Sequence, residues 1–358
     1  MAQRVGMAFL ALAAIWPGRL AAEGYRTKGQ CDGFPAVMLQ TPSGLCVGLV
    51  ANHLGFTRGV AVAGDAIYLL DMGGWRRGHG RLLRLDHGGH GAPKVLLSGL
   101  DEPNALAVTP DGTLYAGLLG RVVRVVLSGP EPVLEDVLTG FPNTGRHPLP
   151  ALAAAPDGSL YVNVASGTDH CEDPGGKPPN PAAPCPERAT IPPRASTIRF
   201  TPGPAALPWV DAELVASGLR NSMALTILPG GALLAAVNAR DWINRADPAL
   251  LDTSFPHDTF HVVAAGADYG WPYCFDAQRP SPEYPGHDCS AVAKPALLLP
   301  PHAAPLGLLL YRGQALPGLT GRLVLPYHGY RAGGHRVMSL AIGQDGQPMG
   351  KPTLLIWG

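Results

Sequence analysis

A strand-turn-strand unit recurs along this chain at a fixed interval, and this repeat restricts the possible folds more than any other feature. The turn aspartates Asp65, Asp111 and Asp157 precede the apolar strands AIYLL, TLYAG and SLYVN and are 46 residues apart (65 to 111, 111 to 157). A turn at Gly230-Gly231 precedes a fourth such strand, ALLAA. This interval suits the four-stranded blade of a β-propeller. A β-sandwich or solenoid is the alternative, and the repeat favours an all-β propeller.

The interval in sequence between the third turn and the fourth is longer than the 46 residues that separate the earlier turns. The excess lies in a Pro-rich segment, residues 167–196, which carries one pair of cysteines before the strand STIRF resumes. Insertions on one face of a propeller commonly build a binding site. A fifth unit is expected from GLLLYRG to GRLVLPYHG, residues 307–329.

Composition limits the class of protein and its partners. Of the 358 residues, 46% are hydrophobic, and Gly and Pro are frequent, which favours many short strands in one large domain, residues 23–358. Lys and Arg number 27, as do Asp and Glu. Because the charges balance, the chain has no excess of positive charge that would attract nucleic acid or an anionic membrane. We therefore expect a small-molecule partner and no nucleic acid.

The N-terminus predicts export. Arg4 precedes an apolar stretch from Gly6 to Trp16, and small residues follow it as far as Ala22, which is the build of a cleaved signal peptide over residues 1–22. The alternative is a membrane anchor, but the stretch is shorter than the ~20 residues that span a bilayer. We expect a periplasmic or secreted protein without a stable membrane span.

The six cysteines fit an oxidising compartment. They lie at Cys31 and Cys46, Cys171 and Cys185, and Cys274 and Cys289, so sequential pairing would close three short loops. No C-x-x-C motif is present, which favours disulfides over thiolate metal sites. Six cysteines allow about 15 connectivities, and the sequence alone does not choose among them.

Five segments together resemble the quinoprotein glucose/sorbosone dehydrogenase family. They are GRHPLPALAAAPDGSLYV at 145–162, GLRNSMAL at 218–225, GADYGWPYC at 266–274, HAAPLGLLLY at 302–311 and HGYRAGGHRV at 328–337. The similarity runs from about Cys31 to Leu340. The resemblance implies a six-bladed propeller that binds pyrroloquinoline quinone (PQQ) and calcium on its top face. It also implies oxidation of an aldose or related sugar, with electrons passed to a quinone or cytochrome acceptor.

The resemblance also names candidate cofactor contacts. PQQ is a planar tricarboxylate, and a guanidinium offers a planar fork of donors that suits carboxylates. Arg220 and Asn221, charged and polar residues at the mouth of an apolar hairpin, match the Arg-Asn of the family. Further candidates are Arg331, Arg336 and His328.

His147 is the candidate general base. Removal of a hydride from a sugar carbon requires a base for the hydroxyl proton, and a neutral imidazole suits this near physiological pH. His147 opens the third blade, where the family carries its catalytic histidine. Arg146 stands where better-known glucose-oxidising members carry Asp, and Pro148 to Pro150 replace small residues, which departs from the pattern at the substrate side.

Candidate calcium ligands lie in the segment that leads into YGWP. Calcium prefers carboxylate and carbonyl oxygens, and in the family it would polarise the quinone and hold its carboxylates. Asp258 and the carbonyl of Tyr269 are the predicted ligands, with Asp241 as a weaker competitor. Thr259 stands where other members offer a second acid.

Only five blades are countable in the sequence. A reduced sixth blade from residues 37–50 and the C-terminal residues, a truncated chain, or closure with five blades are the alternatives. Two other functions stay open: a non-catalytic propeller that binds carbohydrate or protein, and calcium-dependent lactone hydrolysis. The latter needs several buried acids near the central metal, and few acids lie at the strand entries.

Overall fold

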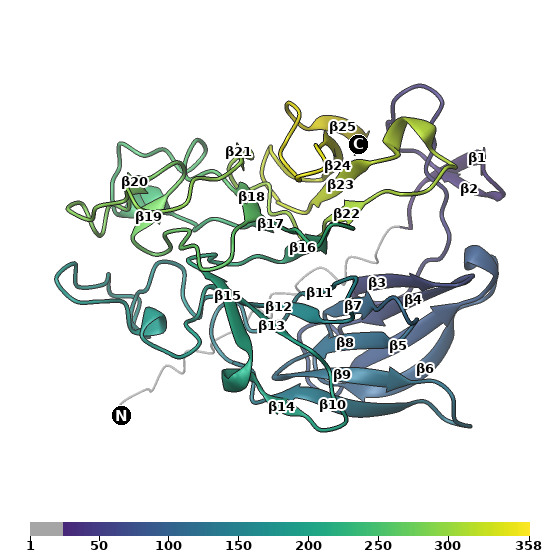
Figure 1. Cartoon of the computed structure of the whole chain (residues 1–358). Helices are drawn as coiled ribbons and strands as arrows, with labels where there is room; N and C mark the ends of the chain where they lie inside the picture. Colours follow the sequence, from purple (N-terminus) through teal and green to yellow (C-terminus); the bar gives the residue numbers. More distant parts are fainter. Residues whose placement is uncertain (1–23) are drawn as a thin grey trace, which may run out of the picture.

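The computed structural model describes residues 24–358, which form five small antiparallel sheets arranged as a propeller (Figure 1). The first sheet contains β3 (Thr57–Ala63), β4 (Ala66–Asp71), β5 (Gly80–Leu85) and β6 (Lys94–Leu100). The second contains β7 (Ala105–Val108), β8 (Leu114–Leu118), β9 (Arg121–Val126) and β10 (Val133–Thr139), with β14 (Leu207–Pro208) added in parallel to β10. The third contains β11 (Leu152–Ala154), β12 (Leu160–Val164), β13 (Ser196–Phe200) and β15 (Glu213–Ser217).

The fourth sheet contains β16 (Ala224–Ile227), β17 (Leu233–Val237), β18 (Thr259–Val263) and β21 (Leu297–Leu298). The fifth contains β22 (Leu309–Leu310), β23 (Arg322–Tyr327), β24 (Arg336–Ala341) and β25 (Thr353–Trp357). Two hairpins lie outside the sheets, β1 (Thr27–Cys31) with β2 (Phe34–Val37) and β19 (Cys274–Phe275) with β20 (Arg279–Pro280). Short 3-10 helices are η1 (His87–Gly89), η2 (Pro186–Arg188), η3 (Trp209–Asp211), η4 (Ile243–Arg245) and η5 (Pro317–Leu319).

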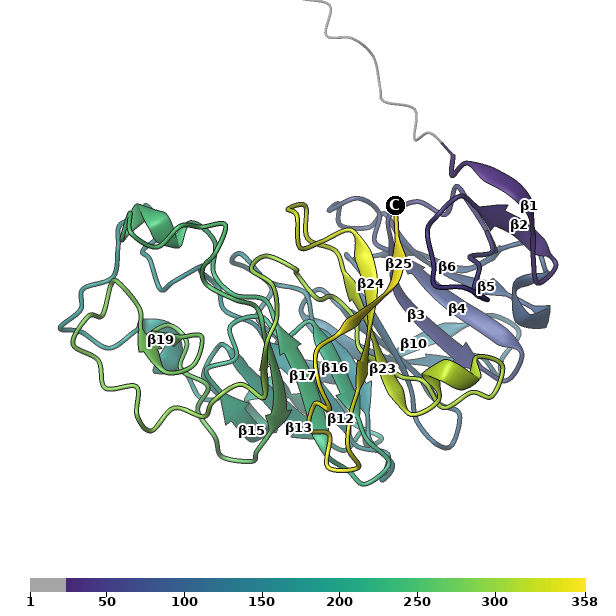
Figure 2. The ribbon, with the colours of Figure 1, turned by 90° about the horizontal axis from the view of Figure 1, so that it is seen from above.

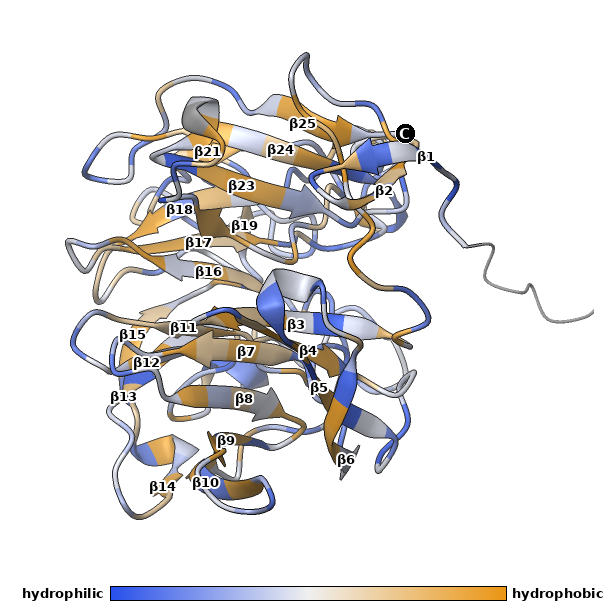
Figure 3. Ribbon diagram, turned by 90° about the vertical axis from the view of Figure 1, so that its right-hand side faces the viewer, coloured by the Kyte–Doolittle hydropathy of each residue, from blue (hydrophilic) through white to orange (hydrophobic). Residues whose placement is uncertain are grey.

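The core lies between the faces of adjacent sheets. Both faces of a central blade are covered, so strands such as β8 and β17 are buried along their whole length and read as continuous apolar runs. Leu82 of the first sheet and Leu118 of the second belong to one buried cluster, and Leu234 and Leu323 belong to another, between the fourth and fifth sheets. Figure 3 shows this as hydrophobic colour concentrated on the strands.

The 46-residue period of the sequence is visible as a chain of hydrogen bonds between blades. Arg58 Nε donates to Asn104 Oδ1 at 3.1 Å, and Asn104 Nδ2 donates to the carbonyl of Pro150 at 2.8 Å. Each partner lies 46 residues after the previous one, and all three lie within two residues of the start of an inner strand. The entries of β3, β7 and β11 therefore meet at one end of the propeller.

The described chain forms five blades and not the six that the family resemblance implies, in agreement with the five-bladed alternative. Residues 24–56 contribute the β1–β2 hairpin and then an isolated antiparallel bridge from Gln40 to Trp357 of β25. Figure 2 and Figure 3 show the C-terminus on the side of the molecule that carries this hairpin. Ala51 and Leu54 of this segment pack against Leu69 of the first sheet, and Leu49 and Leu69 both line an apolar cavity of about 420 Å³.

All six cysteines form disulfides, and the pairing is sequential: Cys31–Cys46, Cys171–Cys185 and Cys274–Cys289. The Pro-rich insertion, residues 167–196, connects β12 to β13 and carries the second of these bonds. The proposed signal peptide, residues 1–22, lies outside the described residues. Helical structure in the described part is limited to short 3-10 turns, none with the length and apolarity that a bilayer crossing requires.

Candidate functional site

The candidate site lies at the end of the propeller where the inner strands begin. His147 precedes β11, and Arg220 and Asn221 precede β16, in blades whose inner strands are neighbours. The backbone N–H of Ser166, which follows β12, donates to the carbonyl of Arg220 at 2.8 Å and so ties the third blade to the fourth. The structure therefore brings the predicted base and the predicted Arg-Asn pair to one rim.

The hydrogen bonds of His147 define its tautomer. Nδ1 lies 3.0 Å from the carbonyl oxygen of Ser166 and 3.1 Å from its hydroxyl. Because a carbonyl only accepts, Nδ1 carries the proton, which leaves a lone pair on Nε2 of the neutral ring. Burial and the nearby Arg220 guanidinium lower the pKa of His147 well below its usual value. The imidazole is neutral at pH 7 and is able to accept a proton.

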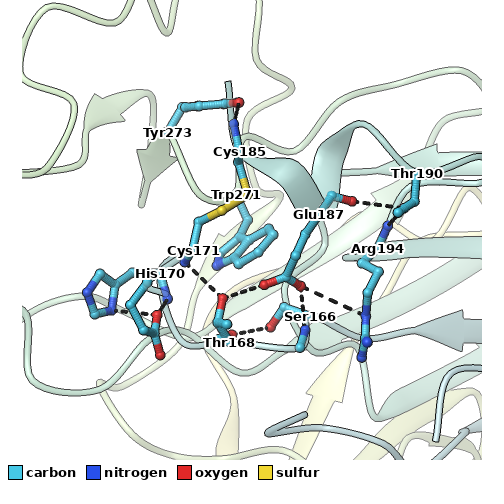
Figure 4. The surroundings of a disulfide bond; sticks show 12 residues. Ser166, Thr168, His170, Cys171, Cys185, Glu187, Thr190, Arg194, Trp271 and Tyr273 are labelled. Carbon is cyan, nitrogen blue, oxygen red and sulfur yellow. Dashed lines mark hydrogen bonds and ion pairs between the residues drawn. A yellow bond between two sulfur atoms is a disulfide. The ribbon is translucent and has the colours of Figure 1, made fainter. Parts of the chain in front are cut away.

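The disulfide-bonded insertion holds the partner of His147 in place (Figure 4). Ser166 Oγ donates to the carbonyl of Thr168 at 2.7 Å, and the Thr168 hydroxyl donates to Glu187 on the far side of the loop. Glu187 also accepts from the backbone N–H of Gly167 at 2.5 Å. The Cys171–Cys185 bond closes the loop beside these contacts. The insertion thus fixes the carbonyl that orients the imidazole.

The guanidinium of Arg220 donates its hydrogen bonds to groups of the same chain. Arg220 is only 5% exposed, and its Nη2 forms an ion pair with the Asp169 carboxylate. Nε donates to the carbonyl of Asp169 at 3.1 Å, and Nη1 donates to the carbonyls of Asn238 and Ala239 at 3.0 and 2.7 Å. The residue joins the insertion to the loop after β17. Its main visible role is to assemble the rim, whereas the sequence predicted a contact to the cofactor.

Asn221 differs from its neighbour because its carboxamide oxygen has no hydrogen-bond partner in the described chain. The residue is 7% exposed. A buried polar atom without a partner costs about 1–3 kcal/mol, a cost that a ligand or a water would remove. Asn221 is therefore the member of the Arg-Asn pair that is left available for a bound molecule.

A network of alternating charges continues from His147 towards the fifth blade. Arg146 Nη2 lies 3.1 Å from Asp241, whose other oxygen lies 3.2 Å from Nδ1 of His302. Nε2 of His302 lies 3.4 Å from Asp252, which in turn forms an ion pair with Arg331. Burial opposes ionisation of Asp241, but His302, Arg220 and Arg146 hold its pKa well below the usual range. The structure places the predicted cofactor contact Arg331 in this network.

Of the two remaining predicted cofactor contacts, His328 lies in the loop between β23 and β24, and Arg336 is the first residue of β24. Arg336 donates from Nε to the carbonyl of Gly334 at 2.9 Å and from Nη2 to the carbonyl of Ala332 at 2.5 Å, so it braces its own loop. His328 is exposed, and its pKa is lowered by partial burial of the ring, by Arg58 and by His335.

The predicted metal ligands do not converge. Asp258 is 2% exposed, and its carboxylate accepts backbone N–H groups of Ala239 at 2.8 Å and Ala304 at 2.6 Å. Burial raises its pKa to about 6. Tyr269 instead lines a cavity of about 60 Å³ that Asp258 does not line. Over residues 24–358 no group of three or more His, Cys, Asp or Glu side chains could hold a metal ion.

Arg58 is the site residue that sequence reasoning missed. It is the second residue of the inner strand β3 and lies at the same rim, linked to Asn104. No carboxylate forms an ion pair with it between residues 24 and 358, although burial lowers its pKa. The 46-residue repeat could have predicted this position. Arg58 lies one period before Asn104 and two periods before Pro150, and Pro150 follows the predicted base His147 by three residues.

Comparison with known proteins supports the fold. No family model matches the sequence, and no curated protein matches it. The holo form of the pyranose dehydrogenase PQQ domain from Coprinopsis cinerea has a TM-score of 0.70 at 18% identity, covering 92% of this chain and 88% of that chain. The calcium structure of the Trichoderma reesei carbohydrate-active enzyme of family AA12 has a TM-score of 0.69 at 18% identity, covering 94% and 88%.

A third solved structure, the PQQ-bound form of aldose sugar dehydrogenase from Streptomyces coelicolor, has a TM-score of 0.57 at 18% identity, covering 88% of this chain and 84% of that one. Two of these three structures are thus named as PQQ-containing sugar dehydrogenases, the group that the motifs pointed to. At these identities the likeness establishes the fold. The chain has the propeller fold shared by these solved sugar dehydrogenases.

Proposed function

We propose that this protein is an exported PQQ-dependent dehydrogenase that oxidises a sugar hydroxyl, with His147 as the general base. The observation that carries the proposal is the state of His147: Nδ1 is tied to a carbonyl, the ring is neutral, and Nε2 retains its lone pair at a rim with other polar groups. Three disulfides support export, because such bonds persist mainly in oxidising compartments.

The rim residues fit a planar, anionic cofactor. Asn221 offers a buried amide that lacks a partner, and Arg58 offers a guanidinium without an acid. His328 adds a third polar group beside Arg58. Asn221 and His328 would hold PQQ, which when bound would supply a quinone that accepts a hydride, and the Arg58 guanidinium stays free for another anionic group at the same rim. The electron acceptor that regenerates it, a quinone or a cytochrome, remains part of the proposal.

The chain itself supplies proton transfer and orientation. Oxidation of an alcohol carbon breaks a C–H and an O–H bond, so that two electrons leave with the hydride and the proton remains. Nε2 of His147 takes this proton, and the Ser166 carbonyl steadies the imidazolium that results through Nδ1–H. Such a base contributes about 10²- to 10⁴-fold in rate.

Calcium at the predicted ligands does not fit this arrangement. Both carboxylate oxygens of Asp258 already accept backbone N–H groups, and the residue is only 2% exposed. A divalent cation needs an ionised, accessible carboxylate. We therefore derive no step through the metal at Asp258 and Tyr269.

The proposal is tested by calorimetric titration of the folded protein with PQQ, followed by a sugar screen with an artificial electron acceptor. We expect micromolar or tighter binding, about 8 kcal/mol or more. His147→Gln keeps PQQ binding and lowers turnover about 10²-fold or more, whereas the exposed control His87→Gln leaves both unchanged. A folded protein that binds no PQQ would refute the dehydrogenase proposal.

That outcome would favour a non-catalytic propeller that binds carbohydrate or protein at the same rim. The observation on its side is that Arg220 and Arg331 are neutralised by Asp169 and Asp252 of the same chain. Cations that are already paired contribute little further attraction for an anionic cofactor.

A further inference from the structure

The arginines at the rim divide into two kinds. Those that are buried or half-buried in the network each have a carboxylate partner: Arg220 with Asp169, Arg331 with Asp252 and Arg240 with Glu283. The exposed Arg146 is paired with Asp241. Arg58 is half-buried and has no ion pair with an acid in residues 24–358; Arg336 also lacks one, but its Nε and Nη2 donate to carbonyls of its own loop. An unpaired cation that is partly withdrawn from water is costly, which marks a place where an anion binds.

The guanidinium of Arg58 is held in a fixed orientation. Nε donates to Asn104 Oδ1 at 3.1 Å, and Asn104 is itself buried. The guanidinium carbon lies 5.6 Å from the ring of Trp75 and 6.0 Å from that of Phe56. The terminal nitrogens Nη1 and Nη2 make no hydrogen bond to the described residues and are not sealed from solvent. Nη1 and Nη2 of Arg58 are therefore free to donate hydrogen bonds to a ligand that binds at the rim.

The surroundings of Arg58 are basic. His328 and His335 belong to the loop before β24, and Arg58 is among the groups that lower the pKa of His328. Asp71, the strand partner of Thr57, lies near Arg58 but forms an ion pair with Arg81, and the other acids of the rim each face another arginine or a histidine. The local field thus favours a negatively charged group and disfavours a cation.

Arg58 also lies on the His147 side of the rim. Its hydrogen-bonded partner Asn104 reaches the carbonyl of Pro150, three residues after the base. The exposed aromatic face of Trp75, with 53% of the residue accessible, adds an apolar surface next to the guanidinium. A ligand held here would combine an anionic end with a less polar ring.

We propose that Arg58 binds the carboxylate of a sugar acid, so that the substrates are uronic or aldonic acids and not neutral aldoses. The inference rests on the proposed function and names its substrate class. A planar carboxylate accepts two parallel N–H donors from a guanidinium, and a neutral hydroxymethyl group does not. The other source of a carboxylate is the cofactor, and the two sources are separable by experiment.

The test compares D-galacturonate with D-galactose, which differ only in the carboxylate at C6. Binding to the protein without PQQ is followed by calorimetry and by the fluorescence of Trp75, with Trp75→Phe to assign the signal. We expect galacturonate to bind about ten-fold or more tightly than galactose, since a charge-assisted hydrogen bond is at stake. Arg58→Gln removes this preference, Arg58→Lys restores part of it, and Arg121→Gln, in a remote surface ion pair, changes nothing.

Equal affinity for the two sugars, or a preference that survives in Arg58→Gln, would overturn the inference. A variant in which PQQ affinity falls while the galacturonate preference persists would assign Arg58 to the cofactor and also overturn it. Failure of PQQ to bind the wild-type protein would refute the dehydrogenase proposal alone, because the sugar titration is made without PQQ. Circular dichroism of each variant confirms that it is folded.

Discussion

Replacement of Asp169 by Asn removes the carboxylate that pairs with Arg220 and leaves the guanidinium buried. Both side chains are 5% exposed, so water does not replace the lost partner. The backbone N–H of Asp241 loses an ionised acceptor as well, since it donates to Asp169 Oδ1 and Oδ2 at 3.1 and 3.2 Å. Breaking a buried ion pair on one side costs about 3–5 kcal/mol.

The three backbone carbonyls that accept from Arg220 remain in the variant and keep the loss within this range. For a chain of this size, unfolding entropy is about 0.7 kcal/mol per kelvin, so the melting temperature falls by roughly 4–7 °C. Urea unfolding followed by circular dichroism gives the free energy directly. The matched control is Asp136→Asn, which breaks the exposed pair with Arg121 and costs less than about 1 kcal/mol.

The double variant Asp169→Leu with Arg220→Met tests the reasoning. If an unpaired buried cation causes the loss, removing both charges recovers at least about 2 kcal/mol relative to Asp169→Asn. A loss below about 1 kcal/mol in the single variant, or no recovery in the double variant, would refute the claim that this pair assembles the rim.

Two further predictions concern stability. The pKa of Asp258 is about 6 in the folded protein, whereas its ordinary value is 3.8. The folded state therefore binds this proton more tightly than the unfolded state does. The resulting contribution to the unfolding free energy is lost as the pH rises from 4 to 6. Relative to Asp258→Asn, the unfolding free energy of the wild type should fall by about 3 kcal/mol over that window, and pH-independent differences in urea titrations would contradict this. Replacing Cys171 and Cys185 by Ser opens a 14-residue loop and should cost about 3 kcal/mol. It should also reduce the turnover that depends on His147, because Ser166 and Thr168 lose their brace; unchanged turnover would show that the insertion does not position the base.

Much of the fold follows from local sequence signals. The turn residues and the short apolar runs predict the hairpins, and the β16–β17 hairpin and the fifth unit, β22 with β23, are found where expected. The spacing of the cysteines made sequential pairing an attractive option, and the structure selects it. The number of blades depends on how the two ends of the chain meet, as in the bridge from Gln40 to Trp357, and such long-range pairing has no local signature.

The site was only partly predictable for the same reason. His147, Arg220 and Asn221 lie before inner strands, and the entries of successive inner strands meet at one rim, but their roles there stay predictions. The partner of Arg220 is Asp169, which is 51 residues away on an inserted loop, and no periodicity relates the two. Asp258 was predicted as a calcium ligand from the family resemblance of the segment that leads into YGWP, whereas in the structure its carboxylate accepts two backbone N–H groups.

The pairing of charges at the rim distinguishes the residues that hold the loops of the site together from the residues that are free to bind a ligand. An arginine such as Arg220, matched by a buried acid of its own chain, is committed to holding loops together, and its removal should damage the fold first. Arg58 and Asn221 lack such partners in the described chain, although their positions are set by the same strand entries. Because an unmatched polar group gains most from a ligand, substitutions there should alter affinity more than stability. The contrast between Asp169→Asn and Arg58→Gln, measured in both unfolding and binding, is therefore the sharpest division between scaffold and binding surface that this rim offers.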